Sequence, residues 1–378
     1  MKLQTCLYSS QKGWNELPNK DLDSSDTLLV FFASADQSLI KEEVNQLRQD
    51  FPNSLMIGCS TAGEIFKEEV FDESISLAIL KFEATKLRLV STKIEDPSAS
   101  KNAGFELAKM LEDDELSAAF VLSEGLLVNG SDLVSGINDC LSKDIVVTGG
   151  LAADGGRFED TWVWDGNGFT QGTIAAVGFY GNNVGISHGS RGGWKVLGVD
   201  REVTRSEANV LFELDGKPAL EIYKKHLGEL EKDLPASGLL FPLSIRSDRE
   251  DGDIVRTILA VDEEEQSITF AGNIPLGSRV RLMRASFDQL IDGAMGAASE
   301  IDSSKYSDGS ILSIAISCVG RRLLLGQRTE DELEVVMDEL PKDSEQIGFY
   351  SYGEISPLVS GQCDLHNQTM TLTLIWEN

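Results

Sequence analysis

Histidine, cysteine and basic residues are scarce in this chain, and each shortage makes certain classes of site or partner improbable. The 378 residues include 3 histidines and 5 cysteines. The cysteines are widely spaced and form no Cys-x-x-Cys pair, so no zinc site or dithiol centre is indicated and reduced thiols are expected. The histidines, His188, His226 and His366, are too far apart in sequence for the His-x-x-x-His or His-Glu-x-x-His pair of a metallohydrolase.

The charge balance is one-sided. Lysine and arginine number 33 against 62 aspartates and glutamates, which gives a formal net charge of -29 and an isoelectric point near 4.4. Such a chain repels phosphate backbones and anionic lipid surfaces, so neither nucleic acid nor a membrane is an expected partner. No run approaches the roughly 20 apolar residues that span a bilayer, and the first residues lack an apolar signal segment. We therefore expect a cytoplasmic protein.

Motifs of nucleotide binding and hydrolysis are missing as well. Gly58 and Gly63 have the glycine spacing of a phosphate loop, but Glu64 stands where the lysine belongs, and its carboxylate would repel phosphates. No Gly-x-Ser-x-Gly elbow occurs. One enzymatic alternative is a hydrolase with Cys59 as its nucleophile, although no histidine is adjacent to Cys59 in sequence. The leading prediction is a protein that is not an enzyme.

The sequence does contain a repeat. The frame Gly-x4-Gly-Glu-Ile occurs at residues 58–65 and again at 348–355, and a partial copy lies at 150–156. Each copy follows an apolar run and an amphipathic helix pattern, and each precedes another apolar run. This order predicts an α/β fold of two related domains, with mixed β-sheets flanked by helices and built from repeated strand-helix-strand-strand units. Turn residues at 214–218 place the boundary between domains 1–214 and 215–378.

The frame residues are the first candidate site. Glycine permits positive φ or the close approach of a ligand, so Gly63, Gly150 and Gly353 are predicted to lie at a cleft. The carboxylates of Glu64 and Glu354 are candidate anchors for a ligand amine or guanidinium. The alternatives are that the glycines mark a repeated bulge or turn, and that the carboxylates cap helices or pair with arginines.

The second candidate site is the segment 186–194, which combines glycines with His188, Arg191 and Trp194. An imidazole here could ligate haem iron while Arg191 pairs with a propionate. His366, in a turn before the last apolar run, is the alternative iron ligand. Equally, either histidine could be an ordinary loop residue whose ring bonds to the backbone.

Several separated motifs resemble those of FIST-domain proteins. The segments that resemble the N-terminal FIST part are 58–65, 148–154, 188–194 with Val203-Thr204 after it, and 214–219; those that resemble the C-terminal part are 349–355 and 366–369. The resemblance implies a non-enzymatic sensory module of bacterial signal transduction that binds a small ligand such as an amino acid. A subset of similar proteins, which this chain resembles in architecture, binds haem, senses nitric oxide and acts on a separate histidine kinase.

The leading hypothesis is therefore a cytoplasmic ligand sensor, with haem as the candidate cofactor and nitric oxide as the signal. Its expected partner is a sensor histidine kinase or a cyclic-di-GMP enzyme. The alternatives are an amino-acid sensor without haem, the Cys59 hydrolase and a scaffold without a ligand. Association into homo-oligomers is left open.

Overall fold

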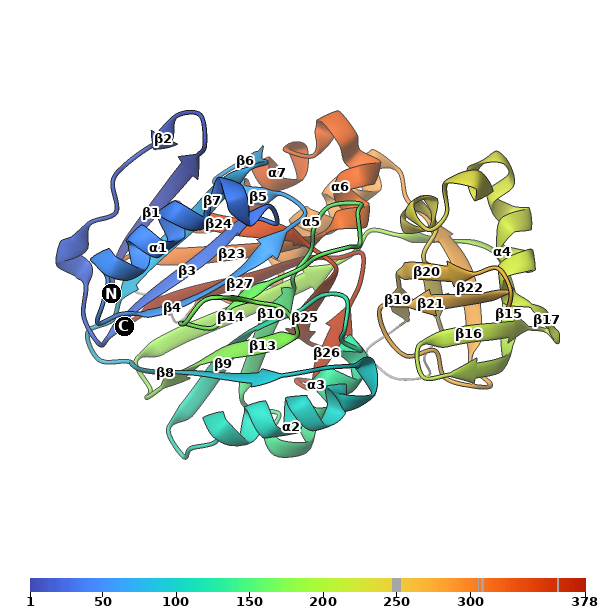
Figure 1. Cartoon of the computed structure of the whole chain (residues 1–378), viewed down its shortest axis with the longest axis horizontal. Helices are drawn as coiled ribbons and strands as arrows, with labels where there is room; N and C mark the ends of the chain where they lie inside the picture. Colours follow the sequence, from blue (N-terminus) through green and yellow to red (C-terminus); the bar gives the residue numbers. More distant parts are fainter. Residues whose placement is uncertain (247–252, 305, 307–308, 359) are drawn as a thin grey trace.

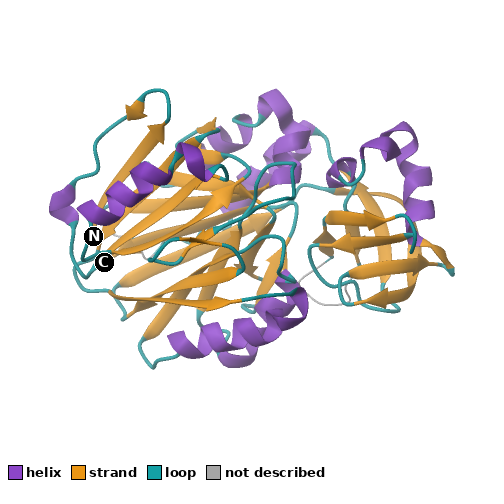
Figure 2. Cartoon of the chain, viewed as in Figure 1, coloured by secondary structure: helices purple, strands orange, loops and turns teal. Residues whose placement is uncertain are grey.

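The computed structural model describes residues 1–246, 253–304, 306, 309–358 and 360–378. They form a large lobe of three β-sheets with helices on the outside and a small lobe made of residues 195–284 (Figures 1 and 2). Mixed sheets flanked by helices confirm the predicted α/β class. Among the described residues, no helix combines the length and the apolar composition needed to cross a membrane.

The large lobe consists of three units that share an order of strand, strand, helix, strand, hairpin and strand, and the second and third units have an additional helix between their first two strands. The first contains β1 (Lys2–Ser9), β2 (Gly13–Trp14), β3 (Thr27–Ser34), α1 (Lys41–Asp50), β4 (Leu55–Thr61), β5 (Glu64–Phe66), β6 (Glu69–Phe71) and β7 (Ser74–Lys81). The second contains β8 (Lys86–Lys93), α2 (Ser100–Leu111), β9 (Leu116–Ser123), α3 (Gly130–Cys140), β10 (Val146–Leu151), β11 (Val163–Trp164), β12 (Phe169–Thr170) and β13 (Thr173–Tyr180). The third contains β14 (Val184–Arg191), α5 (Phe287–Ser299), β23 (Ile311–Cys318), α6 (Val319–Leu325), α7 (Asp331–Glu339), β24 (Ser344–Ser351), β25 (Gly353–Pro357), β26 (Cys363–His366) and β27 (Met370–Glu377).

The small lobe is inserted into the third unit, between β14 and α5. It contains β15 (Lys195–Glu207), β16 (Val210–Leu214), β17 (Lys217–Pro218), α4 (Ala219–Leu227), β18 (Leu243–Ile245), β19 (Ile254–Arg256), β20 (Ile258–Asp262), β21 (Ser267–Phe270) and β22 (Arg279–Arg284). Short 3-10 turns lie at Lys20–Leu22, Gln37–Leu39, Pro97–Ala99, Gly228–Asp233, Ala236–Leu240 and Gly326–Arg328. The sequence boundary at 214/215 falls between β16 and β17, which pair with each other. The division into domains 1–214 and 215–378 thus stays a prediction, because the strands on the two sides of the boundary belong to the same sheet.

The three units exchange hairpins in a cycle. The sheet orders are β12-β11-β4-β3-β7-β1-β2, β26-β25-β10-β9-β13-β8 and β6-β5-β24-β23-β27-β14. Hence β5 and β6 leave the first unit for the sheet of the third, β25 and β26 leave the third for the second, and β11 and β12 leave the second for the first. Each repeated glycine frame is the crossover between two sheets.

The central strands of the three sheets are buried on both faces. Along β3, Leu28, Val30 and Phe32 point into a central core shared by all three sheets, as successive side chains of a strand alternate between its faces. The intervening Leu29 and Phe31 pack on the other side, with α1. Continuous apolar runs are therefore required, because both faces of each central strand are covered.

Candidate ligand-binding cleft

The frame glutamates are buried and hydrogen-bonded within their own units. Glu64, which is 1% exposed, accepts hydrogen bonds from the Thr61 hydroxyl and, at 3.1 and 2.7 Å, from the backbone N–H and hydroxyl of Ser74. Burial raises the pKa of the Glu64 carboxyl to about 7, although the hydrogen bonds act to lower it. Ser74 begins β7, so Glu64 ties the exchanged hairpin to the strand that returns to the first sheet.

Glu354 repeats this geometry in the third unit. It is fully buried and accepts a hydrogen bond from the Ser351 hydroxyl at 2.6 Å, and from the Thr369 backbone N–H and hydroxyl at 3.1 and 2.9 Å. Burial likewise raises the pKa of Glu354 to about 7. Gly150 of the second unit pairs directly with Glu354 across β10 and β25. The structure thus brings frame residues of two units into contact.

The frame glycines permit tight crossovers. Gly63 has φ +127°, and a Cβ there would lie 2.3 Å from Nη1 of Arg322. Gly353 and Gly150 have no such backbone strain, but a Cβ on Gly150 would lie 3.0 Å from Ile316. None of these three glycines lines the large cleft described next, and neither does Glu64 or Glu354. Glu354 lies directly behind its wall, because Thr369 lines it.

A cleft of about 960 Å³ lies where the two lobes meet. The large lobe contributes His188, Arg191, Asp292, Glu300, Asp364, Leu365, His366 and Thr369, and the small lobe contributes Lys195, Val196, Asp253, Val255 and Met283. Trp194, in the connection between the lobes, also lines it. The cleft therefore brings together four predicted site residues, His188, Arg191, Trp194 and His366, from two distant stretches of the sequence.

Both histidines of the cleft favour the neutral form. His188 lies on β14 opposite Thr373, and burial lowers the pKa of its imidazole although nearby Glu300 opposes the shift; His366 lowers it further. Burial also lowers the pKa of His366. Nε2 of His366 is 3.0 Å from the carbonyl oxygen of Ser356, which can only accept a hydrogen bond. Nε2 therefore carries the proton, and Nδ1 keeps a lone pair.

Arg191 and Trp194 are held at the cleft by different contacts. Nε of Arg191 donates to Oε1 of Glu300 at 2.6 Å, and their side chains are 59% and 38% exposed. An ion pair this exposed contributes little, so the guanidinium can exchange Glu300 for a ligand carboxylate at small cost. Trp194 is 8% exposed, and its Nε1 donates to the Gln368 carbonyl oxygen at 3.0 Å. The indole is therefore a fixed wall.

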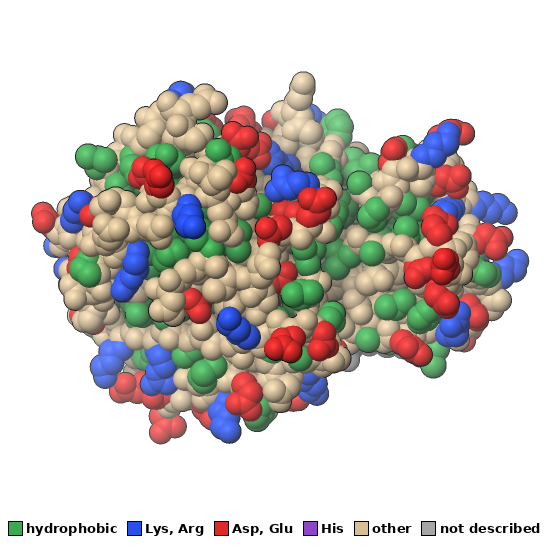
Figure 3. All heavy atoms as spheres, in the orientation of Figure 1, with side chains coloured by type: hydrophobic (Ala, Val, Ile, Leu, Met, Phe, Trp, Pro, Cys, Tyr) green, Lys and Arg blue, Asp and Glu red, His purple; other side chains and the backbone are tan. Residues whose placement is uncertain are grey.

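The acidic side of the cleft was not predicted from the sequence. Asp253 pairs with Arg281 at 2.7 Å, and Glu300 pairs with Arg191. Asp292 and Asp364 make no ion pair within the described part of the chain. Asp364 could have been suspected from its place two residues before His366, but nothing in the sequence marks Asp292 or Glu300. Acidic side chains also lie across both lobes on the face drawn in Figure 3.

Cys59 lacks the properties of a nucleophile. It is completely buried, and burial, with a smaller contribution from Glu64, raises the pKa of its thiol well above the usual value. A buried neutral thiol is a poor nucleophile. Within the described residues, no three His, Cys, Asp or Glu side chains gather as a metal site.

Comparison with known families matches the FIST N domain to residues 27–217 and the FIST C domain to residues 219–357. The chain belongs to the FIST family. FIST domains are sensor domains of signal transduction that bind small ligands and are not typical enzymes. An uncharacterized protein of Methanocaldococcus jannaschii is 23% identical to this FIST protein in an alignment of 369 positions that covers 87% of this chain and 69% of that protein.

Proposed function

We propose that this FIST protein senses a small ligand in the cleft between its lobes, and that haem is the group bound there. The observation that carries the proposal is the meeting of His188 and His366 in one cleft. Burial lowers the pKa of both imidazoles and so favours the neutral form, which is the form that ligates iron. They come from β14 and β26, which are far apart in sequence.

The other lining residues fit haem as well. Trp194, Val255 and Met283 offer apolar surface, and the volume is within the range of about 300–1,000 Å³ that is usual for ligand pockets. Arg191 and Lys195 supply cations for propionates. When bound, haem would supply an iron centre at which nitric oxide could be detected.

The residues of the chain would have two tasks in such a sensor. A histidine lone pair holds the group, while the walls from both lobes make its binding depend on how the lobes are arranged. A ligand shifts this equilibrium only if it binds one arrangement more tightly than the other. The resulting change would act on a separate histidine kinase.

Haem titration of the purified chain tests the proposal. We expect a Soret band that shifts on addition of nitric oxide and that is lost or strongly weakened in His188→Ala or His366→Ala. The matched control is His226→Ala, because His226 lies on α4 in the small lobe, outside the cleft, with its Nδ1 2.7 Å from the Ile222 carbonyl oxygen. Equal haem binding by all three variants would remove both cleft histidines from the site.

The link to a kinase needs its own measurement. We expect autophosphorylation of the cognate histidine kinase to differ between haem-loaded protein with and without nitric oxide. An unchanged kinase under all loading states would contradict the signalling part of the proposal and leave the binding part to the titration.

A second candidate ligand is an amino acid. Asp292 and Asp364, which make no ion pair in the described part of the chain, suit an ammonium group, and Arg191 suits a carboxylate. This version predicts thermal stabilisation by one amino acid, reduced in Asp364→Asn. Stabilisation of wild type by none of the twenty amino acids would contradict it.

A further inference from the structure

The small lobe is joined to the large lobe by two tethers that meet beside the cleft. The first tether is Gly192–Trp194, after β14, and the second is Ala285–Ser286, before α5. Gly192, Gly193 and Trp194 line the cleft, as do Gln289 and Gly293 of α5. The first tether is therefore part of the cleft wall, and the second leads directly into the helix that also lines the cleft.

The first tether packs on α5 with backbone against backbone. Gly193 has φ +87°, and a Cβ there would lie 2.0 Å from the Gln289 carbonyl oxygen. A Cβ on Gly293 would lie 2.7 Å from the Gly192 carbonyl oxygen. With no side chains between them, the tether and the helix have little room to move independently.

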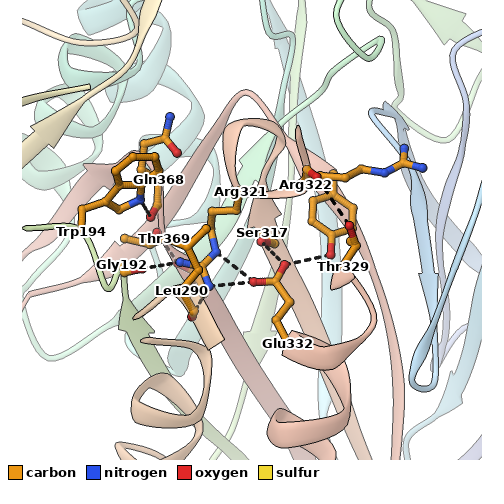
Figure 4. A network of polar contacts seen from close by, with 12 residues as sticks. Gly192, Trp194, Leu290, Ser317, Arg321, Arg322, Thr329, Glu332, Gln368 and Thr369 are labelled. Atoms are coloured by element: carbon orange, nitrogen blue, oxygen red, sulfur yellow. Dashed lines mark hydrogen bonds and ion pairs between the residues drawn. The ribbon is translucent and has the colours of Figure 1, made fainter. Parts of the chain in front are cut away.

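One buried cation holds both of these segments (Figure 4). Arg321 of α6 is 0% exposed. Its Nη1 donates to the Gly192 carbonyl oxygen, and its Nη2 donates to the Leu290 carbonyl oxygen at 2.8 Å. A single guanidinium therefore links the tether to the first turn of α5.

Arg321 is itself anchored to the large lobe by Glu332 of α7. Nε and Nη2 of Arg321 are 3.0 and 2.7 Å from Oε2 of Glu332. Oε1 of Glu332 accepts hydrogen bonds from the Ser317 hydroxyl at 3.0 Å and the Tyr350 hydroxyl at 2.8 Å. Both charges are fully buried, so the pair is costly unless the geometry of all its partners is kept.

At the matching position of the three units, which lies in the described part of the chain in each case, only the unit with the insertion has an arginine. Arg321 lies six residues after Ala315, and Ala315 pairs with the frame glycine Gly348. The same spacing locates the equivalent position in the other two units. In the second unit the structural counterpart of Gly348 is Gly149 and not Gly150, because Gly149 pairs with Ile355 as Gly348 pairs with Ile65. The positions that match Arg321, counted from Phe31 and Val121 as the partners of Gly58 and Gly149, are Gln37 and Leu127. Neither of those units has a lobe inserted after its first strand. The arginine is thus found in the unit whose tethers it holds.

We propose that Arg321 is a positioning residue that fixes the Gly192 wall of the cleft and transmits the occupancy of the cleft to the small lobe. A ligand that contacts Gly192, Gly193 or Trp194 acts on the same backbone that the guanidinium holds. Its binding and the arrangement of the tethers are then coupled in both directions. The ligand aspect rests on the proposed function, whereas the restraint of the tethers does not.

Hydrogen exchange of the full chain tests the restraint. In Arg321→Lys the charge remains, but an ammonium cannot bond Glu332, Gly192 and Leu290 through a planar fork. We expect exchange in peptides covering 190–196 and 286–293 to be at least about tenfold faster in Arg321→Lys than in a control variant that is destabilised at a site far from the tethers. The control is Leu47→Ala in α1, a buried position in the core on the opposite side of the first sheet. Exchange equal to that of the control would overturn the proposal.

Haem serves as the probe of the ligand aspect. We expect haem to slow exchange in both peptides of the wild-type chain and to bind Arg321→Lys about tenfold more weakly, a coupling of ordinary size. Unchanged affinity in Arg321→Lys would overturn the transmission. If wild type binds no haem, the haem version of the proposed function fails, and the comparison with Leu47→Ala still decides the role of Arg321.

A second variant covers the case in which Arg321→Lys does not fold. Glu332→Gln keeps the guanidinium but removes its counter-charge, so the same two peptides must exchange faster than in Leu47→Ala. Exchange that is faster everywhere, without preference for these peptides, would assign the ion pair to global stability alone and overturn the proposal.

Discussion

The two buried frame glutamates predict an unusual dependence of stability on pH. Each carboxyl has a pKa of about 7 in the folded state, whereas the ordinary pKa of a glutamate in an unfolded chain is 4.5. The folded state therefore binds the protons of these two carboxyls more tightly than the unfolded state does. This proton binding stabilises the fold fully below pH 4.5, and the stabilisation is lost as the pH rises through 7. Between pH 5 and pH 8 the free energy of unfolding should fall by about 2 to 3 kcal/mol for each carboxylate.

Replacement of both residues by glutamine should remove this loss while keeping the hydrogen bonds. In Glu354→Gln the amide oxygen can accept from the Thr369 backbone N–H, and the amide nitrogen can donate to the Ser351 hydroxyl oxygen. Glu64→Gln can make the equivalent contacts with Ser74 and Thr61. We therefore expect the double variant to fold and to be the more stable protein at pH 8.

Urea unfolding of wild type and Glu64→Gln/Glu354→Gln at pH 5, 6, 7 and 8 measures the effect. The lowered pKa values of His188 and His366 act in the opposite direction, because unfolded histidines bind protons near pH 6.5. Both proteins share this contribution, so it cancels in their difference. The difference should change by about 5 kcal/mol from pH 5 to pH 8. A change below about 1 kcal/mol would refute the reasoning, since it would mean that burial does not control these carboxyls.

Three further changes test other parts of the structure. Gly193→Ala should lower the urea-unfolding free energy by more than about 2 kcal/mol, because φ is +87° and a Cβ would meet the Gln289 oxygen; a smaller loss would contradict the packing. Hydrogen bonds from residues 83–85 outweigh the effect of burial and lower the pKa of Glu377 to about 2. The Glu377 carboxylate should therefore stabilise the fold above pH 4.5, and this stabilisation should be lost as the pH drops toward 2. Glu377→Gln should thus cost more stability at pH 7 than at pH 3, and equal costs would contradict this. Thiol reagents should label partly exposed Cys140 before buried Cys59, as mass spectrometry of timed samples can show.

The repeating units could be read from the sequence because local patterns define them. The apolar run at 27–34 has to be a strand covered on both faces, and it is β3. The frames at 58–65 and 348–355 mark equivalent crossovers, as their similarity indicated. The candidate site residues, in contrast, lie in two separate places. His188, Arg191, Trp194 and His366 line one cleft, whereas Glu64 and Glu354 are buried inside their units.

The sequence by itself determined the α/β class, the three units and the residue types available for a ligand, because periodicity and glycine placement are local properties. Only the tertiary structure decided that hairpins pass from each unit to the next, that the small lobe interrupts the third unit, and that Asp292, Glu300 and Asp364 join the two histidines. These outcomes depend on strand pairings between segments that are hundreds of residues apart. Such pairings follow from how three apolar sheet faces bury one another, and no local pattern records them.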